Sequence, residues 1–295
     1  MKIKTQEIYS SILKEKEIKL FIKRIDQLNE NNFGNKWFKL KYNLIRAKAK
    51  GAETILTFGG AYSNHIAATA YIARQHRFNS IGVIRGDEHF PLNPTLSFAI
   101  ENGMRLYYVS RNDYRLKSTD VFLEKLKRQF GDFYLIPEGG TNALALKGAE
   151  EILDTNDNQD YICCAVGTGG TIAGVINSIC AGQKVIGFPV VNDLEMLQKN
   201  IETWTKESRW ELINDYLYGG YAKVEASLVK FVTDFYLTYN IPLDIIYTGK
   251  MMMGIFDLIK HDYFSKGSRI LAIHTGGLQG NKGMNERFLY NLPVN

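Results

Sequence analysis

The stretch YICCAVGTGGTIAGVINSIC, residues 161–180, decides the fold class of this chain. It runs from a continuously apolar segment through a glycine-rich turn into a helical pattern. Apolar residues at successive positions, without polar alternation, predict a strand covered on both faces, as in a parallel sheet. Cys163 and Cys164 lie inside that segment and are interpreted as small buried hydrophobic residues of the strand.

The same order of strand and helix recurs on both sides of this stretch. Residues 53–58, 80–86 and 269–277 predict further strands, and residues 65–77 predict a helix between the first two. Strand–helix–strand alternation predicts an α/β fold with right-handed crossovers and parallel sheets.

The composition excludes several classes of protein. Of the 295 residues, 45% are hydrophobic and 23% charged, as expected for a folded globular chain. The 36 basic and 31 acidic residues give a net charge of +5, spread along the sequence, which does not favour a nucleic-acid partner. The sequence contains no apolar run of about 18 residues, so no membrane span is predicted. The N-terminal segment lacks the apolar block of a secretion signal. The three cysteines have no metal-ligand spacing, so no metal site is expected, and their number fits a reducing cytoplasm.

Three glycine-rich turns follow predicted strands, at residues 59–65, 167–171 and 274–278. In an open parallel sheet, ligands bind beyond the carboxyl ends of the strands, where such turns gather. Turns that only close the sheet are the alternative, but three of them exceed what closure requires. The turns therefore predict a ligand-binding site.

The second turn predicts a phosphate-binding loop, made of Gly167, Thr168, Gly169, Gly170 and Thr171. Glycines let the backbone approach an anion closely, and the following helix offers free N–H groups at the positive end of its dipole. The loop has neither the Lys-Ser/Thr ending of a Walker loop nor the spacing of the dinucleotide fingerprint. A tight strand-to-helix turn without a ligand is the alternative interpretation.

A candidate Schiff-base lysine, Lys36, follows Gly34 and Asn35 at a predicted helix start. The positive end of the helix dipole favours the neutral, nucleophilic form of a lysine there. Taken alone, Lys36 could equally be a solvated surface lysine. A phosphate loop together with a reactive lysine is what pyridoxal 5′-phosphate (PLP) requires.

At this point the sequence resembles a known family. Residues 23–26 (KRID) followed by 34–36 (GNK) resemble the lysine segment of fold type II, or tryptophan-synthase-β-like, PLP enzymes. Residues 59–65 (GGAYSNH) are similar to the substrate loop of D-cysteine desulfhydrase and 1-aminocyclopropane-1-carboxylate (ACC) deaminase. Residues 247–250 (YTGK) and 274–280 (HTGGLQG) also match that branch. The matches occur in the right order between about residues 20 and 280.

The resemblance implies two parallel-sheet domains with PLP in the cleft between them. The small domain is expected at residues 42–142, and the large PLP-binding domain at residues 1–41 and 143–295. It also implies a homodimer acting on a small amino acid.

The resemblance assigns roles to the lysine and to the substrate loop. Lys36 holds the cofactor and, once released by substrate, acts as the base at Cα. Asn64 is expected to bond the cofactor ring hydroxyl. Ser63, Asn64 and His65 are expected to bind the substrate, with Ser63 and His65 on its carboxylate. In the deaminase, the serine that corresponds to Ser63 is also a proposed nucleophile or acid–base group.

The remaining assignments lie near the C-terminus. Tyr247 and Tyr221 resemble the two active-site tyrosines of the family, although Tyr221 could also be a packing residue. Thr248 and Thr275 are expected to contact the cofactor, and Thr275 is the candidate for the hydroxyl that faces the ring nitrogen. ACC deaminases are expected to carry glutamate where this chain has Thr248, and glutamine in place of His65.

Both differences favour a D-cysteine desulfhydrase-like lyase that releases ammonia and a 2-oxo acid by β-elimination. ACC deaminase is the alternative enzyme, and a PLP-binding protein with little catalysis is an alternative of another class. Phe38, Lys41 and Ala67 depart from the family pattern without removing a cofactor group, so they affect the prediction of substrate only.

Overall fold

The computed structural model describes residues 3–28 and 33–294 and divides the chain into two compact units. Unit 1 consists of Met1–Asn35 and Leu146–Asn295, and unit 2 of Lys36–Ala145. The first division falls in the first turn of helix α2 (Asn35–Ala49), so that Asn35 belongs to unit 1 and Lys36 to unit 2. The expected limits of the small domain, 42–142, stay a prediction.

Unit 1 is built on a six-stranded sheet with the order β1-β2-β10-β7-β8-β9. Its strands are β1 (Thr5–Ile8), β2 (Lys19–Lys23), β7 (Tyr161–Val166), β8 (Lys184–Pro189), β9 (Trp210–Leu212) and β10 (Arg269–Ile273). All neighbouring pairs are parallel except β1 and β2, which form an antiparallel hairpin at the edge. The carboxyl ends of β7 and β10 therefore point the same way, which brings their glycine turns to one edge.

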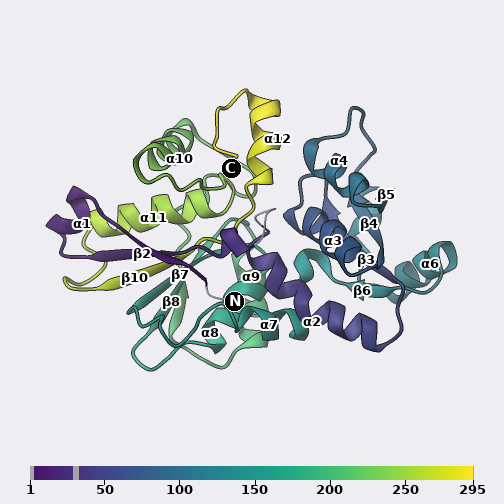
Figure 1. Cartoon of the computed structure of the whole chain (residues 1–295), viewed down its shortest axis with the longest axis horizontal. Helices are drawn as coiled ribbons and strands as arrows, with labels where there is room; N and C mark the ends of the chain where they lie inside the picture. The colour runs from purple at the N-terminus through teal and green to yellow at the C-terminus, as the bar shows by residue number, and fades with distance from the viewer. Residues whose placement is uncertain (1–2, 29–32, 295) are drawn as a thin grey trace. The chain divides into compact units, whose positions relative to one another are not determined.

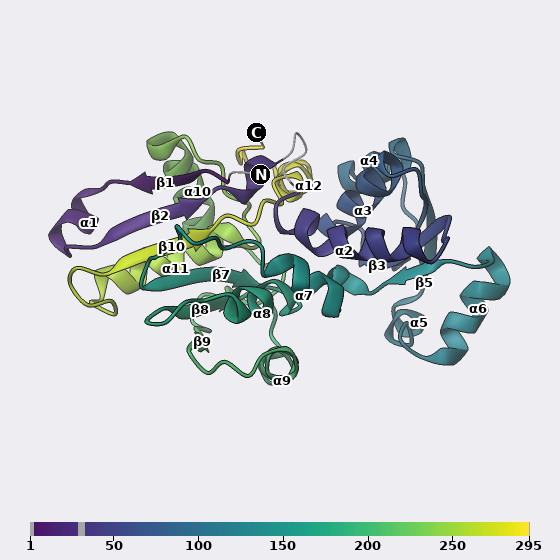
Figure 2. The ribbon, with the colours of Figure 1, turned by 60° about the horizontal axis from the view of Figure 1, so that its bottom comes forward.

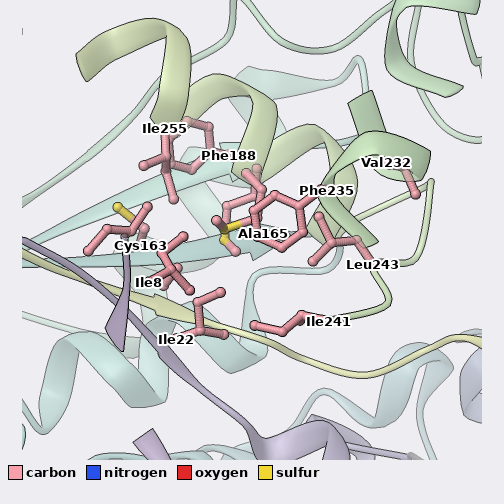
Figure 3. Close-up of a cluster of buried hydrophobic side chains, with 14 of the residues drawn as sticks. Ile8, Ile22, Cys163, Ala165, Phe188, Val232, Phe235, Ile241, Leu243 and Ile255 are labelled. Atoms are coloured by element: carbon pink, nitrogen blue, oxygen red, sulfur yellow. The ribbon is translucent and has the colours of Figure 1, made fainter. Parts of the chain in front are cut away.

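Helices cover both faces of this sheet. Helices α10 (Ala226–Tyr239) and α11 (Thr248–Lys260) lie above it in Figure 1, and α8 (Gly170–Asn177) lies below. The upper core includes Cys163 and Ala165 of β7 and Phe188 of β8, packed with residues of α10 and α11 (Figure 3). Cys164, on the opposite face of β7, is also fully buried. The prediction of a strand buried on both faces is confirmed.

The other helical segments of unit 1 connect these layers. They are α1 (Ser11–Glu15), the short 3₁₀ helix η1 (Ile25–Leu28), α9 (Leu194–Trp204) and α12 (Gln279–Phe288). Helix α7 (Ala143–Ala149) contains the second division between the units.

Unit 2 contains a four-stranded, all-parallel sheet with the order β5-β4-β3-β6. Its strands are β3 (Thr54–Gly60), β4 (Asn79–Arg85), β5 (Met104–Val109) and β6 (Tyr134–Ile136). Its remaining helices are α3 (Asn64–Gln75), α4 (Pro94–Glu101), α5 (Arg111–Arg115), α6 (Asp120–Phe130) and the 3₁₀ helix η2 (Glu138–Gly140). Figure 2 shows α3 and α4 on one side of this sheet and α5 and α6 on the other, each pair packed on its own apolar cluster.

The predicted α/β class with parallel sheets is confirmed. The pattern did not predict the β1–β2 hairpin, the edge strand β9 or helix α12. β1 and β9 are short edge strands with partly exposed residues, so they carry little of the continuous apolar signal of a central strand.

Candidate active site

The glycine-rich loop at 167–171 joins β7 to helix α8. Gly169 has φ +84° and caps the helix in the left-handed region, which an L residue adopts only at a cost. A β-carbon there would also lie 3.1 Å from Cγ1 of Ile201. The loop opens an eight-residue helix, whose first N–H groups have no partner within the helix. This geometry suits an anion such as a phosphate.

The residues before Lys36 are tied to this loop and to the third turn. The amide side chain of Asn35 donates from Nδ2 to Oγ1 of Thr171 at 2.8 Å, and its backbone N–H donates to the carbonyl of Thr275 at 3.2 Å. Gly34 has φ +50°, and a β-carbon there would collide with the Thr275 carbonyl. Lys36 is the next residue in the chain and is half-buried.

His274 shapes the third turn. Its Nε2 donates to the carbonyl of Pro242 at 2.6 Å, and its Nδ1 accepts from the backbone N–H of Gly276 at 3.2 Å. Nδ1 also lies 3.6 Å from Oδ1 of the buried Asp26. Next to it, the Thr275 side chain is almost fully buried, and its hydroxyl makes no hydrogen bond within the described part of the chain.

Asp244 organises the start of helix α11. Its Oδ1 accepts from the backbone N–H groups of Ile246 at 3.0 Å and Tyr247 at 2.8 Å. Its Oδ2 accepts from the backbone N–H of Thr248 at 2.9 Å and from the Thr248 hydroxyl at 2.7 Å. Thr248 is fully buried, and its only hydroxyl proton is committed to Asp244. The expected contact between Thr248 and the cofactor stays a prediction, and any such contact would have to use an acceptor lone pair.

The two candidate tyrosines lie together in unit 1. Their ring centroids are 6.1 Å apart with an edge-to-face angle of 69°. Tyr247 is half-buried, whereas Tyr221 is 42% exposed. The Tyr247 ring also lies against Gly167, the first residue of the glycine loop.

Ser63 and Asn64 open helix α3 in unit 2. The hydroxyl of Ser63 caps the helix by accepting from the N–H of Ile66 at 3.4 Å, which leaves its own proton without an acceptor among the described residues. Oδ1 of Asn64 is buried and has no hydrogen-bond partner in the part of the chain that the structure describes. Buried polar atoms are nearly always paired, so the unpaired oxygen of Asn64 is open to a ligand or an ordered water.

The ring of His65 points into unit 2. Thr57 donates its only hydroxyl proton to the carbonyl of Ile136 at 2.8 Å, so it must accept from Nε2–H of His65, also at 2.8 Å. Nδ1 of His65 is then an unprotonated, buried acceptor without a partner among the described residues. Burial, followed by repulsion from Lys39 and Lys36, holds the pKa of His65 well below its usual value. The expected contact between His65 and a substrate carboxylate stays a prediction, and only its backbone N–H is placed to make it.

The structure therefore brings together, within unit 1, motifs that are far apart in sequence. The group comprises Gly34, Asn35, the loop 167–171, Tyr221, Tyr247, Thr248 and Thr275. Within unit 2 it keeps Ser63, Asn64 and His65 at one helix start. Sequence reasoning missed Asp244. An aspartate three residues before the predicted Tyr247, at a helix start, is the capping signal that could have revealed it.

These residues fit PLP. The glycine loop leaves room where a side chain would intrude, and it presents a helix N-terminus suited to the phosphate. Asn64 offers a buried amide with an unpaired oxygen. Position 275 offers a hydroxyl without a protein partner in the described chain.

A fold of parallel sheets with a glycine-rich anion loop and a lysine at a helix start defines a PLP-dependent enzyme. The family of pyridoxal-phosphate-dependent enzymes matches residues 4–276, and the chain belongs to it. The predicted family, cofactor and enzymatic nature are confirmed.

Individual relatives narrow the class. A putative 1-aminocyclopropane-1-carboxylate deaminase of Thermotoga maritima is 32% identical, over 88% of this chain and 89% of the relative. The bifunctional D-cysteine desulfhydrase/1-aminocyclopropane-1-carboxylate deaminase, mitochondrial, of Arabidopsis thaliana is 30% identical, over 88% of this chain and 73% of the relative. A crystal structure of an ACC deaminase homologue superposes with a TM-score of 0.84 at 28% identity, covering 98% of this chain and 93% of that one. The chain is thus similar to PLP-dependent lyases that are named for both activities weighed from the sequence.

Proposed function

We propose that this protein is a D-cysteine desulfhydrase-like lyase, which removes a β-substituent and the amino group from a small amino acid and releases ammonia and a 2-oxo acid. The observation that carries this choice is the neutral hydroxyl at position 248, which donates to Asp244 at 2.7 Å. ACC deaminases are expected to carry glutamate at position 248, and an acidic group near the pyridine nitrogen strengthens the electron sink of PLP. Threonine at 248 lacks that acid, and the hydroxyl expected to face the nitrogen, that of Thr275, leaves the sink weaker. Opening the ring of ACC, which has no Cα hydrogen, depends more on that sink than does elimination from an amino acid with an acidic Cα proton.

PLP, when bound, supplies the electron sink for the charge that develops at Cα. The backbone N–H groups of residues 167–171 would hold its phosphate, and Asn64 would orient its ring through the ring hydroxyl. Nζ of Lys36 takes the Cα proton of the substrate. Tyr247 and Tyr221 would donate a proton to the departing β-substituent.

The substrate carboxylate binds at the start of helix α3. Ser63 accepts from the helix with its oxygen and so directs its own proton away from the helix, towards an anion. Backbone N–H groups of the first turn add to this site. The ring of His65 contributes by fixing the helix start, because its Nε2–H is bonded to Thr57.

The second candidate function is ACC deamination, which the names of the relatives favour. The test is a panel of D- and L-amino acids, including cysteine and β-chloroalanine, together with ACC, in which ammonia and 2-oxo acid release are measured. We expect turnover of at least one β-substituted amino acid and little or no 2-oxobutanoate from ACC. Faster turnover of ACC than of every β-substituted amino acid contradicts the proposal. A bound cofactor without release from any compound indicates a PLP-binding protein with little catalysis.

Assembly and location form a separate part of the proposal. The part of the chain that the structure describes holds no helix long and apolar enough to span a bilayer. We propose a homodimer that acts in the cytoplasm, as the family resemblance and the cysteine usage suggest. Light scattering on the purified holoenzyme tests the dimer, and a mass of one chain contradicts it.

A further inference from the structure

Lys250, in the first turn of helix α11, is a fully buried lysine. Its Nζ donates to the carbonyl oxygens of Leu217 at 2.7 Å and Gly220 at 2.8 Å. No carboxylate forms an ion pair with it among residues 3–28 and 33–294. A buried ammonium costs free energy unless its donors are well used, so its two carbonyl contacts call for an explanation.

The segment that Lys250 binds has an unusual backbone. Tyr218, Gly219, Gly220 and Ala222 have φ values of 49°, 82°, 108° and 56°, all in the left-handed region. Non-glycine residues pay a steric cost there, so such a segment persists only when its surroundings hold it. It has no regular secondary structure to supply that support.

A second side chain, that of Asn192, also contacts this segment. Nδ2 of Asn192 donates to the carbonyl of Gly219 at 3.4 Å. The side chain of Asn192 packs so closely on Gly220 that a β-carbon at 220 would collide with it. Lys250 and Asn192 thus bind three backbone carbonyl groups of this segment, those of Leu217, Gly219 and Gly220.

The segment leads directly into Tyr221, whose position it therefore sets. It follows Gly220 directly, and its ring centroid lies 6.1 Å from that of Tyr247. Tyr247 is the N-cap residue of α11 and Lys250 lies in the first turn of that helix, so one helix start carries both Lys250 and the partner of Tyr221. The carbonyl of Gly220 is the last acceptor before Tyr221 in the chain.

We propose that Lys250 is a positioning residue, whose ammonium group binds the Leu217 and Gly220 carbonyls and thereby holds Tyr221 against Tyr247. The inference rests on the proposed function in one respect only, namely that Tyr221 takes part in the reaction. The chemistry needs a cation because an ammonium group brings three donors and a charge to two carbonyl dipoles, and no neutral side chain does both.

The charge of the Lys250 side chain is sensitive to pH. Burial is the main cause that lowers the pKa of Lys250 to about 8, and the carboxylates of Asp244 and Glu225 oppose the shift. The ring of Tyr218 lies 5.8 Å from Nζ, and burial raises its pKa to about 12, so it stays neutral when Lys250 titrates. Two residues before Tyr218, the hydroxyl of Tyr216 donates to Asp257. Above pH 8 the ammonium loses its proton, and the hold on Tyr221 weakens.

The first test observes Tyr221 without using turnover. 4-Fluorophenylalanine, whose ring carries no titrating hydroxyl, placed at position 221 of the holoenzyme reports the environment of that ring by ¹⁹F NMR. We expect one resonance near neutral pH that shifts with an apparent pKa of about 8. In Lys250→Met we expect a displaced or broadened resonance without that titration. An unchanged resonance in Lys250→Met, or no titration in the wild type, overturns the proposal, and the wild-type titration decides even where the variant does not fold.

The second test asks whether Lys250 acts through Tyr221. Lys250→Met should lower kcat roughly 10- to 100-fold, the range expected for a misplaced catalytic group, with a smaller change in KM. In a Tyr221→Phe background the same change should have little further effect, because the group it positions is gone. Additive effects overturn the proposal.

Lys23→Met is the control for a loss of stability. Lys23 is equally buried but pairs with Asp154 and Asp157, so its substitution should leave the fluorine resonance unchanged. Failure of the proposed function would appear separately, as absent turnover by the wild type in the substrate panel.

Discussion

The phenol ring of Tyr247 lies directly against the backbone of Gly167. A β-carbon at position 167 would stand 3.2 Å from Cε1 and 3.6 Å from the hydroxyl oxygen of Tyr247. The first residue of the predicted phosphate loop and a predicted catalytic tyrosine are therefore in contact. Glycine at 167 is needed because any larger residue would push the ring away.

Gly167→Ala should consequently impair turnover more than folding. The added methyl group forces the Tyr247 ring to move by a few tenths of an ångström, and misplacement of a catalytic group costs roughly 10- to 100-fold in kcat. We expect a change in the free energy of unfolding of about 1 kcal/mol, as is typical of a tolerated substitution. Steady-state kinetics and chemical denaturation measure the two effects. A kcat equal to that of the wild type would mean that Tyr247 has no role that depends on this contact.

Gly169→Val should weaken PLP binding. Gly169 has φ +84° in the loop, and Gly182 has φ +85° on the surface with no atom near its β-position. Gly182→Val therefore carries the same backbone cost without touching the loop, and serves as the matched control. We expect the PLP dissociation constant to rise at least about tenfold, or about 1.4 kcal/mol, for Gly169→Val alone. Equal affinities in both variants would place the phosphate elsewhere.

Lys36→Ala should abolish covalent attachment of the cofactor. Lys36 supplies the amine for the Schiff base, so borohydride reduction should fix no PLP on this variant and turnover should be lost. Lys48→Ala, at an exposed position of the same helix α2, should retain both properties. Peptide mass spectrometry after reduction identifies the modified lysine. Attachment to any other lysine in the wild type contradicts the assignment.

His65 should make the protein sensitive to acid. Its folded-state pKa lies well below the usual value of 6.5, chiefly because of burial. Above pH 6.5 the ring is neutral in both states, so stability is fully present there. As the pH falls below 6.5 the unfolded chain takes up a proton that the folded chain cannot, and stability is lost towards the lowered pKa.

The matched variant is His65→Gln, which keeps an amide donor for Thr57 but does not titrate. Between pH 7.5 and 5.5, the wild type should lose about 1 kcal/mol more of its free energy of unfolding than the variant. Denaturation curves at the two pH values provide the comparison, in which contributions from other groups cancel. Equal losses would show that another group controls the acid response.

Much of the candidate site could be predicted from the sequence. The glycine turns after β3, β7 and β10 were recognisable because a glycine-rich turn between an apolar run and a helix is a local pattern. The roles of Asn64 and Tyr221 came from the resemblance, which also supported the Schiff-base role that the helix start suggested for Lys36, and all three stay predictions. Asp244 and Lys250 were missed because a buried charge has no local signature that separates it from the many exposed ones.

The sequence by itself determined the fold class, because the pattern of apolar residues along the chain indicates each strand and helix locally, as in the unbroken apolar run 161–166. Only the tertiary structure decided which motifs meet. Asn35 bonds Thr171 across 136 positions, and β10 pairs with β2 on one side and β7 on the other. The same structure committed the Thr248 hydroxyl to Asp244 and the His65 ring to Thr57. The physical reason is that periodicity reports whether a residue is buried, whereas its partner depends on how whole elements pack and on which donors and acceptors remain unpaired after they do.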